Sequence, residues 1–229
     1  MQVPQSASYP EHPREELIDF IPQATSVLDV GCAAGGWGGT LRQHLGPNAR
    51  LVGIEAVSSQ AQLAASAGFD EVHCGYFPDD MPVDAGRFEL ITFNDVLEHT
   101  VDPWSVLVEA HNFLAPGGQI LASLPNIQFA PVLVQLLRGR WDYQDDGSLD
   151  RTHLRFFTRA TMIELFETSG FEVDRVEGIN PFGQSYEASA SPAVLLAIRA
   201  ARSLTRNAQF CQFVLVGRSA KRAKTSAAS

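Results

Sequence analysis

The stretch VLDVGCAAGG, residues 27–36, decides the fold of this chain. An apolar strand breaks into glycines at Gly31, and a second apolar strand, residues 51–54, follows and ends at Glu55. Glycines let a ligand approach the backbone closely, and an acid after the second strand can bond both hydroxyls of a ribose. The stretch therefore predicts a nucleotide-type cofactor site.

The spacing of the glycines indicates which kind of cofactor is bound. A dinucleotide fingerprint needs G-x-G-x-x-G, but here three residues separate Gly31 from Gly35, and Ala33 stands where the second glycine is usual. An NAD-dependent oxidoreductase is therefore the weaker interpretation.

Strand and helix patterns alternate along the rest of the chain. The predicted strands are residues 27–30, 51–54, 71–74, 88–93, 119–124, 171–176 and 210–216. The predicted helices are residues 15–21, 37–45, 58–67, 104–114, 129–137, 158–169 and 191–204, the last with Ser191 as N-cap. This alternation predicts a doubly wound, mostly parallel α/β sheet with its ligands at the carboxyl ends of the strands.

Two helix ends are predicted from the positions of glycine and proline in the sequence. Gly68 is expected to close the helix that starts at Ser58. The segment 116–118, Pro-Gly-Gly, is expected to end a helix with one stripe of mostly apolar residues, which are Trp104, Leu107, Val108, His111 and Leu114.

Length and composition restrict the class of protein. The chain has 229 residues, of which 45% are hydrophobic and 19% are charged, and these are globular values. We expect one domain over residues 1–217, with residues 127–157 as a lid or substrate region, 181–208 as a helical insertion and 218–229 as a disordered tail.

Charge and cysteine content bear on partners and compartment. The net charge of −9 disfavours a nucleic-acid substrate, because sequence-independent affinity for nucleic acid depends on Lys and Arg. Cys32, Cys74 and Cys211 are far apart and are expected to be reduced thiols. No apolar run is long enough for a signal peptide or a membrane span, so a cytoplasmic location is expected.

A polar cluster follows the predicted fourth strand and so lies at the expected catalytic edge. Asp95, Glu98 and His99 could take a proton from an acceptor hydroxyl, or they could hold a divalent metal that lowers the pKa of that hydroxyl. A structural alternative is that Glu98 and His99 bond to one another and cap the helix that begins near Pro103.

These motifs resemble those of the class I S-adenosylmethionine-dependent methyltransferases. Their first motif, (V/L)LD(V/I)GCGxG, matches at every position of residues 28–32 and at Gly35, and Ala33 replaces its middle glycine. The segment 94–103 resembles the (D/E)-x-L-E-H and D-P elements of ubiquinone-pathway O-methyltransferases. Residues 139–158 resemble G-x-W-x-Y and G-x-L-D-x-T-H-x-R-F-F-T of bacterial methyltransferases encoded near polysaccharide genes.

The resemblance, which covers residues 9–176, implies a seven-stranded fold with its last strand antiparallel. It also implies S-adenosylmethionine as cofactor, with a divalent metal such as Mg²⁺ as an option. The cofactor-binding residues that it implies are Tyr9, Arg14, Asp29, Gly31, Gly35, Glu55, Tyr76 and Asn94. The implied catalytic residues are Asp95 and either His99 or His153 as base, and the metal ligands would be Asp95, Glu98 and His99.

The function expected from all these features is methyl transfer to a hydroxyl of a small molecule or a glycan. Two alternatives stay open: methylation of a quinone-like phenol or polyketide, and a non-catalytic module that binds S-adenosylmethionine. The helix 191–204 is expected either to roof the acceptor pocket or to form a homodimer contact.

Overall fold

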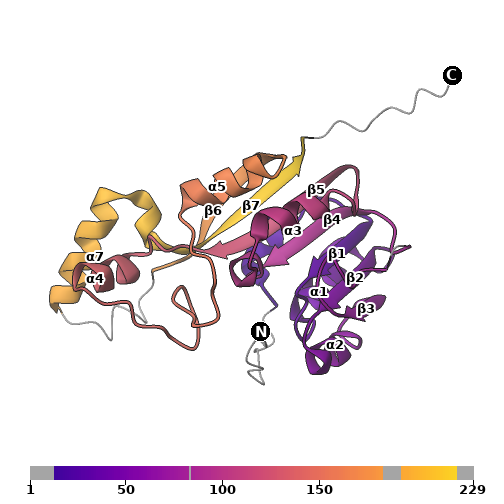
Figure 1. The fold of residues 1–229 in the computed structure, drawn as a ribbon, viewed down its shortest axis with the longest axis horizontal. Helices are drawn as coiled ribbons and strands as arrows, with labels where there is room; N and C mark the ends of the chain where they lie inside the picture. The colour runs from indigo at the N-terminus through magenta and orange to yellow at the C-terminus, as the bar shows by residue number, and fades with distance from the viewer. Residues whose placement is uncertain (1–12, 83, 183–191, 221–229) are drawn as a thin grey trace.

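The computed structural model describes residues 13–82, 84–182 and 192–220 (Figure 1). One seven-stranded sheet has the order β3-β2-β1-β4-β5-β7-β6. β7 is antiparallel to both of its neighbours, and the other adjacent pairs are parallel. The strands are β1 (Ser26–Val30), β2 (Arg50–Glu55), β3 (Glu71–Cys74), β4 (Phe88–Asn94), β5 (Leu114–Pro125), β6 (Phe171–Pro181) and β7 (Phe210–Ser219). The predicted fold class is confirmed, including the antiparallel last strand.

Helices cover both faces of the sheet because the strands are apolar on both sides. Within β1, Leu28 belongs to the core beneath α3 and α5, whereas Val27 belongs to the core beneath η1 and α1. The helices are η1 (Glu15–Phe20), α1 (Gly36–Leu45), α2 (Ser58–Ala64), η2 (Leu97–His99), α3 (Pro103–Ala110), α4 (Ala130–Leu137), α5 (Arg159–Thr168), α7 (Pro192–Leu204) and η3 (Arg206–Gln209). Full burial on both faces is typical of parallel sheets.

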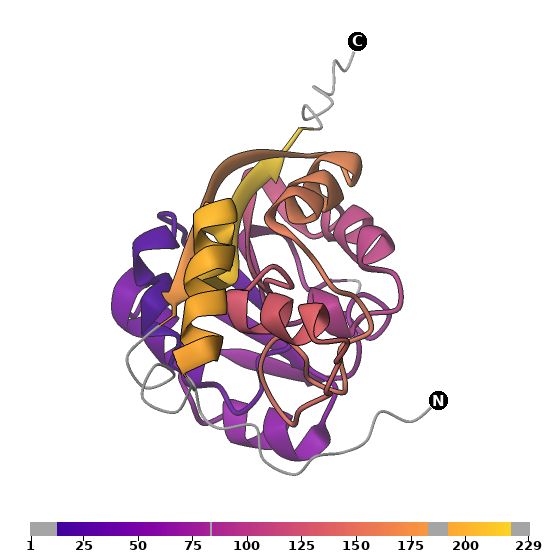
Figure 2. The same cartoon turned by 90° about the vertical axis from the view of Figure 1, so that its left-hand side faces the viewer.

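The helices α4 and α7 form a separate small layer at one end of the molecule. Figure 2 shows α7 in front, with α4 beside it. Their shared core consists of Ala130, Val134, Ile198, Ala201 and Ala208. Both helices connect to the carboxyl edge of the sheet, because α4 follows β5 and α7 precedes the antiparallel strand β7.

The prediction that α2 continues to residue 67 is wrong. The helix ends at Ala64, and the following turns are tighter, since the Ser66 and Ala67 amides bond the carbonyls of Leu63 and Ala64. Gly68 does adopt the left-handed conformation, with φ of 100°. The backbone changes to i→i+3 hydrogen bonds after Ala64, so the α-helix ends about one turn before the position that Gly68 indicates.

The predicted end of α3 is also wrong, and its predicted stripe is buried only in part. α3 ends at Ala110, and β5 begins at Leu114, so Pro-Gly-Gly 116–118 falls within the strand. Leu114 pairs with Phe88 of β4, and this pairing ends the helical pattern before the local punctuation does. Of the predicted stripe, Leu107 and Leu114 are buried, whereas Trp104 and Val108 are each 42% exposed, because the helix turns Ala110 inward beside Leu107.

Three smaller differences concern the ends of elements. Residues 15–20 form a 3-10 helix, η1, in place of the predicted α-helix. β7 extends to Ser219 and so passes the predicted domain boundary at residue 217. Ser191, the predicted N-cap of α7, and the tail 221–229 lie outside the described residues. Within the described parts of the chain, no helix is long and apolar enough to cross a membrane.

Candidate active site

The glycine loop joins β1 to α1 and forms the floor of the candidate cofactor site. Gly31 and Gly35 have φ values of 72° and 93°, a region that disfavours side chains. A Cβ at Gly35 would lie 2.5 Å from the Ala67 Cβ and 2.9 Å from the Ala64 Cα. Ala33 also has a positive φ, 45°, so it adopts a glycine-like conformation where the methyltransferase motif has glycine.

The carboxylate of Glu55 holds this loop in place. One oxygen accepts the Ala33 amide at 3.0 Å, and the other accepts the Val57 amide at 2.8 Å. A carboxylate has about four lone-pair positions, so capacity remains for two ribose hydroxyls. Glu55 is half-buried at the carboxyl end of β2, as its predicted role requires.

Asp29 is buried beneath the loop, in the middle of β1. Its carboxylate accepts the Thr92 hydroxyl of the adjacent strand β4 at 2.6 Å. Burial raises the pKa of Asp29 from its ordinary value of 3.8 to about 7, although the bond from Thr92 opposes the shift. The ionised form of Asp29 is therefore destabilised in the folded protein.

This shift predicts a pH-dependent gain in stability for Asp29→Asn. Because the folded-state pKa is raised, wild-type stability falls as the pH rises from about 4 to about 7. Asparagine carries no charge and can still accept the Thr92 bond, so the variant should gain a few kcal/mol more at pH 8 than at pH 4. Urea unfolding of both proteins at the two pH values measures this gain, and an equal difference at both would contradict it.

Asn94 and Tyr76 flank the same site. Both polar atoms of the Asn94 amide are buried and have no hydrogen-bond partner among the described residues. Buried amide groups are nearly always paired, so this one is available for a ligand. Tyr76 follows β3 and is 60% exposed, free to stack on an aromatic ring, whereas its neighbour Phe77 packs edge-on against the core residue Phe93.

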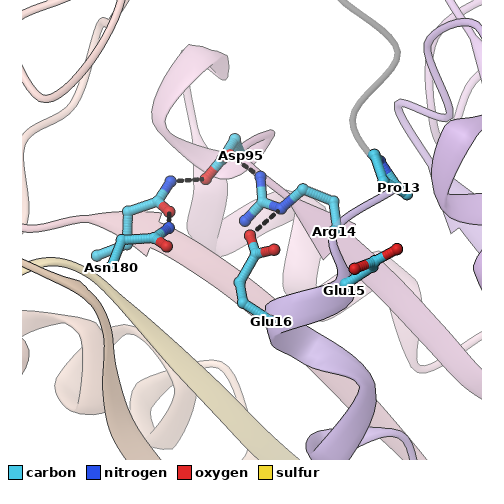
Figure 3. Close-up of a pocket in the computed structure, with 7 residues that line it drawn as sticks. Pro13, Arg14, Glu15, Glu16, Asp95 and Asn180 are labelled. Carbon is cyan, nitrogen blue, oxygen red and sulfur yellow. Dashed lines mark hydrogen bonds and ion pairs between the residues drawn. The ribbon is translucent and has the colours of Figure 1, made fainter.

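A polar cavity of about 460 Å³ lies next to this site (Figure 3). Its residues come from η1 and the segment before it, from the loop after β4, and from β6 and β7. They are Pro13, Arg14, Glu15, Glu16, Asp95, Asn180 and Gln212. Tyr9, predicted to reach over the cofactor together with Arg14, lies outside the described residues.

A chain of polar contacts crosses this cavity. Arg14 forms ion pairs with Asp95 and with Glu16 and donates to the Ser123 hydroxyl at 3.0 Å. Gln212 donates to Asp95 at 2.8 Å and accepts from Asn180 at 2.7 Å. Arg14 is thus paired with protein carboxylates, and the neighbouring Asp95 raises its pKa against the effect of burial.

Glu98, His99 and His153 meet at the rim, although 54 positions separate the last two in sequence. The loop that carries His153 is docked by the amides of Leu154 and Arg155, which donate to the Glu98 carbonyl at 2.8 and 3.0 Å. The two imidazole rings meet edge to face at 4.8 Å, and His153 Nε2 lies 4.0 Å from Glu98 Oε1. Both carboxylate oxygens of Glu98 are buried without a hydrogen-bond partner among the described residues.

The hydrogen bonds of His99 define which of its nitrogens is free. Its Nδ1 lies 3.3 Å from the Thr152 carbonyl, which can only accept, so Nδ1 carries the proton. The Thr152 hydroxyl donates to Asp150 at 2.6 Å and lies 3.2 Å from the same nitrogen. Nε2 of the neutral ring therefore presents a lone pair, and burial lowers the pKa of His99 and so favours that neutral form.

Burial also shifts the pKa values of the other two residues of the cluster, His153 and Glu98. Burial and the neighbouring His99 lower the pKa of His153. Burial and the nearby Asp95 raise the pKa of Glu98 well above its ordinary value. The cluster therefore consists of two imidazoles that favour the neutral form and a carboxyl group whose ionised form is costly in isolation and would be stabilised by a bound cation.

The structure brings together a different candidate metal set from the one the sequence predicts. One ligand atom each from Glu98, His99 and His153 lies within 4.8 Å of the others. Asp95 is engaged by Arg14, Gln212 and Ser123 instead. The predicted capping role of Glu98 and His99 is not seen, because Asp102 caps α3 by accepting the Ser105 amide.

Sequence reasoning missed several residues of the site. Thr152 orients His99, and Asn180 and Gln212 line the cavity from the two last strands of the sheet. Thr152 directly precedes His153 in the motif D-R-T-H, residues 150–153, so this motif could have indicated it. Asn180 and Gln212 carry no local signal, because only the insertion of β7 beside β5 brings them to this edge.

Comparisons with known proteins agree with this arrangement. The family model described as a methyltransferase domain matches residues 5–176. The ubiquinone biosynthesis O-methyltransferase of Pseudomonas paraeruginosa is 28% identical over 182 residues, which cover 71% of this chain and 72% of that protein.

Two solved structures share the fold. One is a complex between the Haloferax volcanii Trm112 methyltransferase activator and a methyltransferase, with a TM-score of 0.62 and 19% identity over 91% of this chain and 89% of that one. The other is a SAM-dependent methyltransferase of Thermotoga maritima described as a possible histamine N-methyltransferase, with a TM-score of 0.61 and 17% identity over 90% and 86% of the two chains.

The chain belongs to the methyltransferase-domain family and is a class I S-adenosylmethionine-dependent methyltransferase. It is therefore an enzyme, which removes the alternative of a non-catalytic binding module. The glycine loop, Glu55 and the Asn94 amide, which has no partner within the described segments, fit S-adenosylmethionine, which supplies the electrophilic methyl group when it is bound.

Proposed function

We propose that this enzyme transfers a methyl group to a hydroxyl of a small molecule or a glycan. The observation that carries the proposal is the lone pair on His99 Nε2, which has no hydrogen bond among the described residues. Thr152 orients this ring at the edge of the sheet where the acceptor is expected. A neutral imidazole can take the proton of a hydroxyl as its oxygen attacks the sulfonium methyl. The reaction needs the oxygen, the methyl carbon and the sulfur in line, so positioning supplies much of the rate.

The cavity beside Asp95 supports a polar acceptor over a quinone-like phenol. Three of its residues are carboxylates and two are amides, and Pro13 is its one apolar residue among those described. Amides and carboxylates can bond the several hydroxyls of a sugar, whereas an aromatic quinone precursor favours apolar walls. The polar lining of the cavity therefore favours a polyhydroxylated acceptor.

A divalent metal such as Mg²⁺ is a further part of the proposal. Glu98, His99 and His153 would hold it, because their ligand atoms are close together and the Glu98 carboxylate lacks a partner among the described residues. Such an ion lowers the pKa of a bound hydroxyl. In either case the proposal assigns to His99 and His153 the holding and deprotonation of the acceptor oxygen.

The remaining expectations become part of the same proposal. Residues 127–157 would cover the acceptor, since the loop that carries His153 is bonded to Glu98. A cytoplasmic location is supported by three cysteines that are all free in the structure. A nucleic-acid acceptor stays disfavoured by the net charge of −9.

Transfer of labelled methyl groups from S-adenosylmethionine tests the proposal. The acceptors would be a panel of methyl glycosides, catechol, and a primary amine, each with Mg²⁺ and with a chelator. We expect labelled methyl ethers of the glycosides. Transfer to catechol alone would favour the quinone-like alternative, and transfer to the amine alone would overturn O-methylation.

A further inference from the structure

The outer surface of the α4–α7 layer has an unusual distribution of side chains. Its core consists of Ala130, Val134, Ile198, Ala201 and Ala208, whereas Leu137, Leu196 and Leu204 are turned outward. These leucines are 83%, 70% and 87% exposed. Amphipathic helices of soluble domains normally turn leucine toward the core, so three leucines that are each at least 70% exposed on one small two-helix layer are more than folding of the layer requires.

The exposed apolar residues form a continuous row on α7. Pro192, Leu196, Ala200 and Leu204 are spaced by four residues and are all exposed, so they follow one side of the helix. A groove of about 200 Å³ beside this helix is lined by Val194 and Ala197 of α7 and by Val134, Leu137 and Arg138 at the end of α4. In Figure 2, α7 lies in front with this end of the molecule toward the viewer.

The charge of this layer is opposite to that of the whole protein. Residues 130–139 and 192–209 contain four arginines, Arg138, Arg199, Arg202 and Arg206, and no Asp or Glu, although the chain has a net charge of −9. None of the four arginines forms an ion pair within the part of the chain that the structure describes. We call the three exposed leucines with these four arginines the leucine–arginine face.

We propose that the leucine–arginine face docks on an anionic lipid bilayer surface. Leucines that enter the interfacial region and arginines that contact lipid phosphates are the two terms by which amphipathic helices bind membranes. A second copy of the chain fits this face poorly, because pairing would bring arginines against arginines without an acid between them. Both helices connect to the carboxyl edge of the sheet, the edge at which the candidate active site lies.

Co-sedimentation of the full-length protein with vesicles tests the proposal independently of the methylated acceptor. We expect binding to vesicles of phosphatidylglycerol and phosphatidylcholine in equal parts, and at most weak binding to phosphatidylcholine alone. Added salt should weaken the binding, because surface charges are screened. Arg199→Glu with Arg202→Glu should lower the affinity about 20-fold or more, since each arginine contributes roughly a fivefold factor.

Leucine variants separate docking from general electrostatic attraction. Leu196→Gln with Leu204→Gln should lower vesicle affinity at least about tenfold. The matched control is Leu63→Gln on α2, where a 55% exposed leucine lies outside this face, and it should bind vesicles as the wild type does. Circular dichroism and S-adenosylhomocysteine binding verify that each variant is folded.

Three results would overturn the proposal. The first is absence of binding to the anionic vesicles by the folded wild-type protein. The second is equal loss of binding in the Leu63 control. The third is a homodimer that light scattering shows to dissociate in the Leu196/Leu204 variant, because the face would then be covered by a second copy.

Discussion

His153→Ala is expected to lower turnover by about 100-fold or more while the affinity for S-adenosylhomocysteine stays within a few-fold. The imidazole of His153 is buried against His99 and lies 4.0 Å from the carboxylate of Glu98. It is not among the residues that form the glycine loop or hold Glu55. The substitution should therefore remove chemistry at the acceptor oxygen and leave the cofactor bound.

The measurement pairs methyl-transfer kinetics with calorimetric titration of S-adenosylhomocysteine. Leu154→Ala is the matched control, since Leu154 is 48% exposed on the same loop and docks through its backbone amide, which alanine retains. The control should keep turnover within a few-fold. A large loss of cofactor affinity in His153→Ala would contradict the assigned role and indicate that the loop supports the cofactor site.

Glu55→Ala is expected to lower the affinity for S-adenosylhomocysteine by about 100-fold or more. Its carboxylate accepts the amides of Ala33 and Val57. We propose that it also accepts two ribose hydroxyls of the cofactor. Charge-assisted hydrogen bonds contribute roughly 1.5–3 kcal/mol each, so losing those to the ribose accounts for an effect of this size. The substitution would also remove the hydrogen bond that holds the Ala33 amide, and Ala33 has a positive φ.

Calorimetry on Glu55→Ala and on Glu71→Ala measures this effect. Glu71 is an acid of the neighbouring strand β3 whose side chain is 48% exposed and paired with Arg50 at the start of β2, away from the loop. Its removal should leave cofactor affinity unchanged. Affinity of Glu55→Ala within threefold of wild type would show that the ribose is bound elsewhere.

The strand pattern could be predicted because it is a local property. Buried parallel strands are nearly continuous apolar runs, and all seven predicted strands overlap the observed ones. Helix ends were predicted less well, since α2 ends in tighter turns at Ala64 and α3 ends where Leu114 pairs with Phe88. Both helix ends depend on contacts that the positions of glycine and proline in the sequence do not predict.

By itself the sequence determined the cofactor half of the site. Asp29, Gly31, Gly35 and Glu55 lie within 27 residues, and one strand–loop–helix unit with the next strand places them together. Short sequence separation makes such a site a consequence of local folding and of one parallel strand pair.

Only the tertiary structure decided the acceptor half. His153 reaches His99 because the loop amides of Leu154 and Arg155 bond the carbonyl of Glu98, and Gln212 reaches Asp95 because β7 inserts between β5 and β6. The same packing pairs Asp95 with Arg14 and so removes it from the candidate metal set. These contacts join residues 54 to 117 positions apart, and no local periodicity or spacing specifies which distant side chains meet.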